Sequence, residues 1–104
     1  MQRRIWKARL MPGMLNEYVR RHNEIWPEMV QALRACGIHN YTIWNHGEEL
    51  IGYYECPDLE MADQYKVRSD VMRKWSVSMA GIMEMITDSE SGLPLQYTQV
   101  FELD

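Results

Sequence analysis

The spacing of apolar residues changes several times along the chain, and the order of these changes limits the folds that it can adopt. Residues 3–10 alternate in character, which is typical of a strand. From Met14 the apolar positions recur at intervals of three and four residues, which predicts a helix, and Pro27 suits the first turn of a second one. Alternation returns over residues 38–45 and 49–56, which predicts a hairpin.

After the hairpin, the second half of the chain again predicts helices followed by a strand. Helical spacing resumes near Glu60, and Ser69 or Asp70 can cap the longest predicted helix. Residues 88–94 are typical of a loop, and residues 95–102 alternate again, which predicts a last strand. The apolar side of the longest predicted helix is formed by Met72, Trp75, Met79, Ile82, Met83 and Ile86.

The predicted order is therefore strand, helices, strand, strand, helices, strand. This is the βαββαβ arrangement of ferredoxin-like α+β domains, an antiparallel sheet with helices on one face. A chain of 104 residues has the size of one domain, which we expect to span residues 1–104. The uncovered face of the sheet needs a partner, so we expect a homodimer of the dimeric α/β-barrel type, joined sheet to sheet.

Composition excludes several classes of protein. Hydrophobic residues make up 46% of the chain and charged residues 25%, which indicates a soluble globular protein. The net charge of -4 makes nucleic acid a poor partner. No segment approaches the roughly 20 apolar residues of a membrane span, and no apolar run follows the basic N-terminus, so we expect no signal peptide. Cys36 and Cys56 form no close pair, which favours reduced thiols and a cytoplasmic location.

The first predicted helix carries the most informative pair of polar side chains. Tyr18 and His22 lie four residues apart, on the same face as Leu15 and Val19, so both point inward. A phenol and an imidazole on an inward face need hydrogen-bond partners or a pocket. By itself this pattern is more often that of a satisfied core histidine than of a catalytic one, and both interpretations stay open at this point.

Further aromatic and acidic residues can join this pair. Alternation places His39 and Tyr41 on one side of the strand over residues 38–45, and Glu55 ends an apolar strand, where a carboxylate needs a partner. Tyrosine rings usually pack with the hydroxyl at the edge, and Trp75 is a core residue by periodicity. Alternatively, these side chains line a sugar site, because sugar C–H faces pack on aromatic rings while hydroxyls need donors and acceptors.

Other chemistries have little support in the sequence. It contains no GxSxG nucleophile elbow, no glycine-rich phosphate loop and no HExxH motif. His39 and His46 have no third ligand at a suitable spacing, so they form at most a weak metal site. The residues alone therefore give little support to a metal site or to a nucleotide-binding loop.

Three segments resemble one known family. Residues 17–28, EYVRRHNEIWPE, resemble the EYxxRHxxxWPE signature of the L-rhamnose mutarotases. Residues 37–43 are similar to the family's GxxNYxI strand, and residues 69–75 resemble the segment that leads to its tryptophan pair. The resemblance covers nearly the whole chain. The first motif is specific, because it combines a dibasic pair, a histidine, Trp-Pro and an acid at fixed spacing.

The resemblance implies a ferredoxin-like fold that dimerises and an enzyme that interconverts the α and β anomers of L-rhamnose without a metal or an organic cofactor. His22 matches the family's proton donor, and Tyr18 and Tyr41 match its substrate-binding tyrosines. Trp75 matches the first of two substrate-binding tryptophans, but Ser76 stands at the position of the second. The loop before the last strand also departs from the family's sequence. Both departures concern the identity of the sugar more than the reaction.

A mechanism follows from the chemistry of imidazole, whose usual pKa of about 6.5 lets it donate or accept a proton near neutrality. We expect His22 to protonate the ring oxygen, while a tyrosine, a carboxylate such as Glu55, or water takes the anomeric proton. One alternative is a monooxygenase of the dimeric ferredoxin-like type, in which a helical histidine ligates haem, although this rests on fold analogy alone. The other alternative is a sugar-binding module without catalytic activity.

Overall fold

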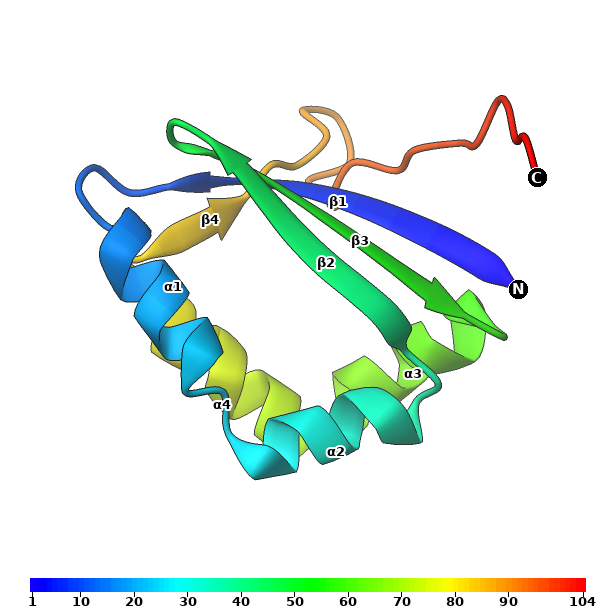
Figure 1. Cartoon of the computed structure of the whole chain (residues 1–104), viewed down its shortest axis with the longest axis horizontal. Helices are drawn as coiled ribbons and strands as arrows, with labels where there is room; N and C mark the ends of the chain where they lie inside the picture. The colour runs from blue at the N-terminus through cyan, green and yellow to red at the C-terminus, as the bar shows by residue number, and fades with distance from the viewer.

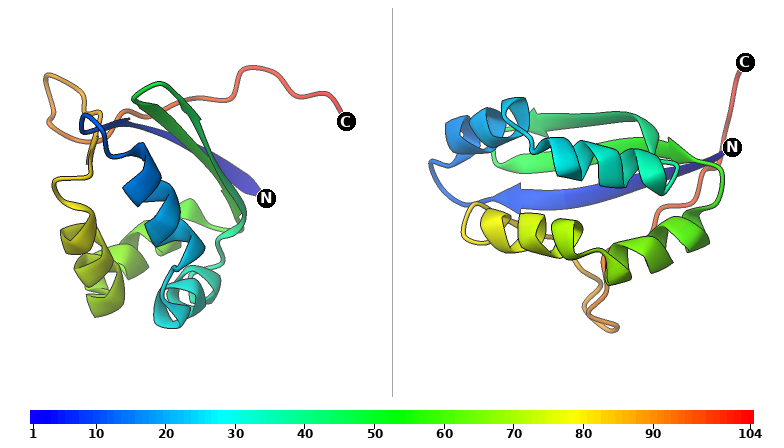
Figure 2. Two further views of the ribbon diagram at one scale, coloured as in Figure 1. Left: turned by 60° about the vertical axis from the view of Figure 1, so that its left-hand side comes forward. Right: turned by 90° about the horizontal axis from the view of Figure 1, so that it is seen from below.

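In the computed structural model, which describes residues 1–104, a four-stranded antiparallel sheet carries four helices on one face (Figures 1 and 2). The strand order β2-β3-β1-β4 is that of a ferredoxin-like domain, so the predicted fold class is confirmed. None of the helices has the length and apolar character needed to cross a bilayer. The elements in chain order are β1 (Gln2–Leu10), α1 (Leu15–Asn23), α2 (Pro27–Ala35), β2 (His39–His46), β3 (Glu49–Cys56), α3 (Leu59–Arg68), α4 (Asp70–Met79) and β4 (Met83–Met85).

Local sequence signals set the limits of the second helix. Pro27 occupies the first helical position of α2, where its missing N–H has no partner to lose. At the other end, Gly37 adopts a φ of 86°, a left-handed conformation that glycine tolerates. The N–H of Gly37 donates to the carbonyl of Arg34, and that of Ile38 to Leu33, each at 3.0 Å. This Schellman pattern turns the chain directly into β2.

Side-chain caps begin the two later helices. The Ser69 hydroxyl accepts the backbone N–H of Met72 at 3.2 Å at the start of α4, as predicted. The Asp58 carboxylate accepts the N–H of Met61 at 3.2 Å at the start of α3. The α3–α4 pair thus divides at Ser69, and the α1–α2 pair divides just before Pro27.

The predicted last strand is wrong. Helix α4 ends at Met79, and Gly81, with a φ of 84°, turns the chain so that β4 pairs with β1. The prediction extended the helix to Ile86 because its apolar residues keep helical spacing across this turn. Residues 95–102 form no strand within the chain.

A bulge shapes β2. Two of its residues, Asn40 and Tyr41, stand opposite the single residue Tyr54 of β3. Asn40 has a φ of 49°, which a short polar side chain tolerates better than other residues with a Cβ. The extra residue reverses the alternation of the strand on either side of it. The ring of Tyr41 consequently lies over the inner face, 5.1 Å from the ring of Tyr54.

The bulge corrects one prediction about side-chain direction. His39 pairs with Glu55, whose side chain lies on the outer face of the sheet, away from the helices. Tyr41 lies on the inner face with Tyr54, which is buried. His39 and Tyr41 are therefore on opposite faces, and the prediction that they share one side is wrong.

The two faces of the sheet differ in burial. The inner face carries the core, including Ala8, Leu10 and Leu50, each 1% exposed. The outer face is open to solvent, and the segment 95–104 runs beside β1 on this side (Figure 1). Arg3 of β1 holds this segment through hydrogen bonds to Gln99 at 3.2 Å and Glu102 at 2.9 Å. The apolar side chains that this segment exposes are Tyr97, Val100, Phe101 and Leu103.

Candidate active site

Tyr18 and His22 lie on the inner side of α1, one turn apart. Tyr18 is buried and His22 is half-buried, and their rings stack with centroids 4.2 Å apart. The Nδ1 atom of His22 lies 2.9 Å from the backbone carbonyl oxygen of Tyr18. A carbonyl only accepts, so Nδ1 carries the hydrogen in this contact. The neutral ring therefore keeps its free lone pair on Nε2.

The surroundings of these two residues set their protonation. Burial lowers the pKa of His22 below its usual value of 6.5, and the hydrogen bond to the Tyr18 carbonyl acts in the opposite direction. Burial also raises the pKa of the Tyr18 hydroxyl well above its usual range. Near neutrality this part of α1 therefore presents an uncharged base beside a protonated phenol.

Trp75 of α4 lies beside His22. Its ring meets the His22 ring edge-on, with centroids 5.4 Å apart, and meets the Trp26 ring in the same way at 5.2 Å. Trp75 is half-buried and borders a pocket of about 270 Å³. The residue thus packs against the core, as its periodicity predicts, and its ring also borders this pocket, whose lining does not include His22. The other residues that line this pocket are Arg20, Arg21, Glu24, Trp26 and Ser78.

Tyr41 reaches the inner face through the bulge in β2. The residue is 36% exposed although it faces the helices, so side chains do not close the inner face at this edge of the sheet. Its hydroxyl oxygen lies in the interior and accepts a hydrogen bond of 2.9 Å from Nε1 of Trp6. Burial raises the pKa of this hydroxyl well above its usual range, and the bond from Trp6 acts in the opposite direction.

Ser76 is an exposed residue of α4 beside two buried ones. It lies four residues after Met72 and three before Met79, so all three side chains project from the same side of the helix. Both methionines are buried, whereas Ser76 is exposed. A larger side chain at this position would extend into solvent beside the two methionines.

Glu55 is not near His22. It lies on the outer face of the sheet, where Nδ2 of Asn40 donates to it at 2.8 Å and the Tyr53 hydroxyl at 2.7 Å. These two hydrogen bonds lower the pKa of the Glu55 carboxyl below its usual range. Alternation along β3 separates Glu55 from the buried residues Leu50 and Tyr54 on the inner face. The sheet therefore stands between this carboxylate and the imidazole.

Two aromatic residues near these side chains were not predicted as site residues. Trp6 lies on the inward-facing side of the first strand, a direction that the alternation of residues 3–10 does predict, but its contact with Tyr41 depends on strand order. Trp26 directly precedes α2, and its contact with Trp75 depends on how α2 and α4 pack. No local sequence signal predicts either contact.

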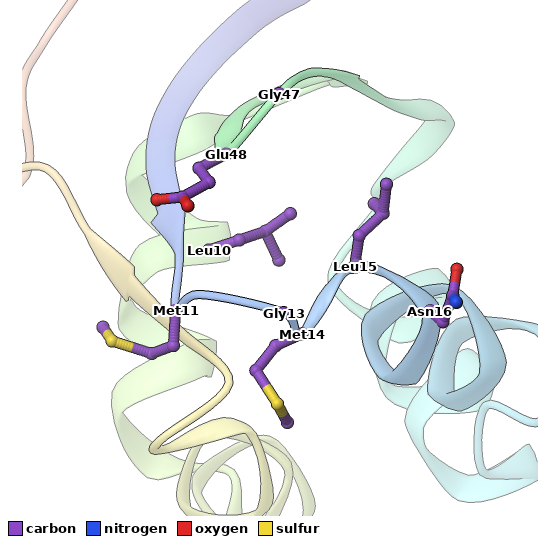
Figure 3. Close-up of a pocket in the computed structure, with 8 residues that line it drawn as sticks. All are labelled: Leu10, Met11, Gly13, Met14, Leu15, Asn16, Gly47 and Glu48. Atoms are coloured by element: carbon purple, nitrogen blue, oxygen red, sulfur yellow. The ribbon is translucent and has the colours of Figure 1, made fainter.

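A second pocket lies at the end of the sheet where β1 leads into α1 (Figure 3). Its volume is about 220 Å³, and Glu48 is its only titratable side chain. It offers no acid–base pair. No group of three or more His, Cys, Asp or Glu side chains is arranged to hold a metal ion anywhere in the chain. The residues that line this pocket are Leu10, Met11, Gly13, Met14, Leu15, Asn16, Gly47 and Glu48.

The fold and these side chains define a ferredoxin-like protein with a neutral histidine set among aromatic rings on the inner side of its sheet. A model of the L-rhamnose mutarotase family matches residues 3–103. An L-rhamnose mutarotase of Lachnoclostridium phytofermentans is 39% identical over 106 residues, which cover 100% of both chains. The chain therefore belongs to the L-rhamnose mutarotase family.

Solved structures agree with this assignment. The crystal structure of an L-rhamnose mutarotase from Formosa agariphila superposes with a TM-score of 0.79, at 25% identity and with 100% of both chains covered. A dimeric ferredoxin-like protein from an uncultured marine organism superposes with a TM-score of 0.59 at 13% identity, over 98% of this chain and 96% of that one, which supports the fold alone. Family membership favours the mutarotase interpretation over a monooxygenase.

Proposed function

We propose that this chain interconverts the α and β anomers of L-rhamnose, or of a closely related 6-deoxyhexose, at the inner side of α1. The observation that carries the proposal is the state of His22, a neutral imidazole whose Nδ1 is held by the Tyr18 carbonyl and whose Nε2 is free. Membership of the mutarotase family supplies the class of substrate. We assign the activity to one domain, residues 1–104.

Proton transfer at Nε2 opens the ring. The neutral imidazole takes the anomeric proton, the C1–O5 bond breaks with its electron pair going to O5, and the imidazolium returns the proton to O5. The product is the open-chain aldehyde, which rotates about C1–C2 and closes by the reverse steps on its other face. In this scheme His22 protonates the ring oxygen, as the sequence predicted, with the proton that it has just accepted.

The sequence offers three candidates for the group that takes the anomeric proton: a tyrosine, a carboxylate such as Glu55, or water. The raised pKa of the Tyr41 hydroxyl makes its anion a rare species and a poor candidate for a base. The hydrogen bonds of Glu55 to Asn40 and Tyr53 hold that carboxylate on the outer face. His22 itself, acting directly or through a water molecule, is the candidate best supported by these contacts.

Binding requires polar and apolar contacts around the reacting carbon. Tyr18 and Tyr41, which burial keeps protonated, orient sugar hydroxyls by hydrogen bonds. Trp75, beside the His22 ring, offers an apolar surface to the C–H face or the methyl group of the sugar. Ser76 borders the sugar with a small hydroxyl in place of a second indole.

We further propose that the chain acts as a cytoplasmic homodimer joined through the outer faces of two sheets. Ile5 and Trp44 on this face are 40% and 68% exposed, and Phe101 of the C-terminal segment is 76% exposed. A second copy that covers these apolar side chains removes them from water. The free thiols of Cys36 and Cys56 support the cytoplasmic location.

The substitution His22→Asn tests the catalytic assignment. Saturation-transfer NMR measures exchange between the anomer signals of L-rhamnose, and loss of general acid–base catalysis lowers the rate about 10²- to 10⁴-fold. His46→Asn makes the same change at an exposed residue of the hairpin and should leave the rate unchanged. A folded His22→Asn protein with wild-type exchange contradicts the role of His22. Ligand-induced thermal stabilisation without any exchange above the spontaneous rate indicates a sugar-binding module instead.

A further inference from the structure

Trp6 lies flat across the neighbouring strand. Its Cα pairs with that of Gly52 in β3, and a Cβ added to Gly52 would come within 2.0 Å of Cε2 and 2.2 Å of Nε1 of the indole. No side chain fits between this backbone and the ring. A glycine in the middle of a central strand weakens the strand, and here its use is to admit the indole.

The indole spans the sheet as far as β2. Gly52 pairs on its other side with Ile43, so β3 separates Trp6 from the strand that carries Tyr41. Neighbouring strands are about 4.8 Å apart, so only a long side chain bridges two such spacings. Nε1 of Trp6 ends 2.9 Å from the Tyr41 hydroxyl oxygen. The bulge at Asn40 is what turns that hydroxyl to the inner face.

This contact fixes what the Tyr41 hydroxyl can do. An indole N–H only donates, so the phenol oxygen must be the acceptor, and its own hydrogen points elsewhere. No other side chain accepts from the Tyr41 hydroxyl. Accepting one hydrogen bond also strengthens the next one that the same hydroxyl donates. The pair therefore presents a directed donor on the inner face of the sheet.

We propose that Trp6 is a positioning residue that holds the Tyr41 hydroxyl as a hydrogen-bond donor to the sugar. This inference rests on the proposed sugar site. Trp6 acts through Tyr41, so its contribution to binding disappears when the Tyr41 hydroxyl is absent. The indole also packs against two of the three buried clusters, so a truncation to alanine would disturb the core. Trp6→Phe keeps an aromatic ring over Gly52 and removes the N–H.

A double-mutant cycle tests this coupling. The dissociation constant of L-rhamnose is measured by NMR titration for wild type, Trp6→Phe, Tyr41→Phe and the double variant. Loss of one hydrogen bond worth about 0.5–1.5 kcal/mol raises the constant roughly 2- to 10-fold in the wild-type background. In the Tyr41→Phe background, Trp6→Phe should change it by less than about 2-fold. An equal factor in both backgrounds overturns the proposal.

Trp44→Phe is the matched control. Nε1 of Trp44 also donates to a hydroxyl, that of Thr42 at 3.1 Å, but it does so on the outer face of β2. This variant should bind L-rhamnose as the wild type does.

An ¹⁵N spectrum supplies a readout that does not depend on turnover. The indole N–H signal of Trp6 is the one absent in Trp6→Phe. It should shift when Tyr41→Phe removes its acceptor, and it should stay in place in Trp44→Phe. A Trp6 signal that does not respond to Tyr41→Phe overturns the proposal even if the variants fold poorly enough to blur the binding data.

The outcomes separate this inference from the proposed function. A wild-type protein that binds L-rhamnose and shows the predicted coupling, but does not accelerate anomer exchange, contradicts the mutarotase function and supports the role of Trp6. A wild-type protein that exchanges anomers while the cycle shows no coupling supports the function and overturns the role of Trp6. Absence of both binding and exchange overturns both.

Discussion

The ring of His22 stacks on the ring of Tyr18 while its Nδ1 hydrogen bonds to the carbonyl of the same tyrosine. One residue therefore fixes both the plane and the tautomer of the imidazole. The helix supplies this geometry, since residues four apart lie one above the other on α1. Only Nε2 remains for proton exchange with a substrate.

The pH dependence of kcat/KM follows from this arrangement. Burial lowers the pKa of His22, so the neutral form, which accepts the proton, predominates at pH values above that lowered pKa. We expect kcat/KM for anomer exchange to be level above pH 6.5 and to fall as the pH drops through the lowered pKa. Saturation-transfer NMR across a pH series measures the profile. A rate that rises on acidification below 6.5 would indicate that the imidazolium is the resting catalyst.

Tyr18→Phe provides the control for this profile. The variant keeps the stacked ring and the backbone carbonyl, which together with burial determine the state of His22. The midpoint of the acid limb should therefore stay where it is in the wild type. Loss of the hydroxyl should appear in KM, because that group is proposed to bind the sugar.

The bulge in β2 makes a prediction about stability. Asn40 has a φ of 49°, a conformation that is costly for a β-branched residue. Asn40→Val should lower the free energy of unfolding by about 1–3 kcal/mol. Asn40→Gly relieves the backbone and loses only the exposed hydrogen bond to Glu55, so its effect should be within about 0.5 kcal/mol. Urea denaturation compares the two, and equal losses would show that the backbone conformation is unimportant.

Most of the fold was predictable because its signals are local. Alternation and helical spacing give the order of the elements, while Pro27, Gly37 and Ser69 mark helix ends through backbone geometry and capping. The last strand was not predictable in the same way. Met79 and Ile86 keep helical spacing across a turn at Gly81, and the alternating segment 95–102 has no strand partner within its own chain.

In the candidate site, too, the contacts within one helix were predictable from the sequence, and those that depend on the packing of the fold were not. Spacing on one helix face predicts that Tyr18 lies beside His22, and the stripe of α4 predicts that Trp75 faces inward. The face on which Glu55 lies depends on which set of alternate residues in β3 packs under the helices. The packing of the whole fold decides this, and the local sequence does not. The contact of Trp6 with Tyr41 joins residues 35 positions apart and depends on strand order, a bulge and a glycine between them.

A further prediction concerns the contribution of the C-terminal segment to the stability of the proposed dimer. Phe101 is 76% exposed in the single chain and belongs to the segment 95–104, which runs beside β1 on the outer side of the sheet. We expect Phe101→Asp to shift the protein from dimer toward monomer in light scattering, because burying a charge in an apolar contact is costly. Val67→Asp changes a residue of α3 that is 87% exposed and should leave the dimer intact. A wild-type protein that is monomeric at all concentrations would contradict the proposed dimer.

The last prediction concerns the effect of Ser76 on the affinity for the sugar. Its neighbours on the same side of α4, Met72 and Met79, are buried while Ser76 is exposed, so an indole at this position has room beside them. An added aromatic contact is worth about 0.5–1.5 kcal/mol, so Ser76→Trp should bind L-rhamnose roughly 2- to 10-fold more tightly. Val77→Trp adds the same side chain at a position that is 67% exposed and should leave binding unchanged. Weaker binding in Ser76→Trp would mean that the serine side chain makes room for a bulkier sugar, and the same NMR titration with other 6-deoxyhexoses would then identify it.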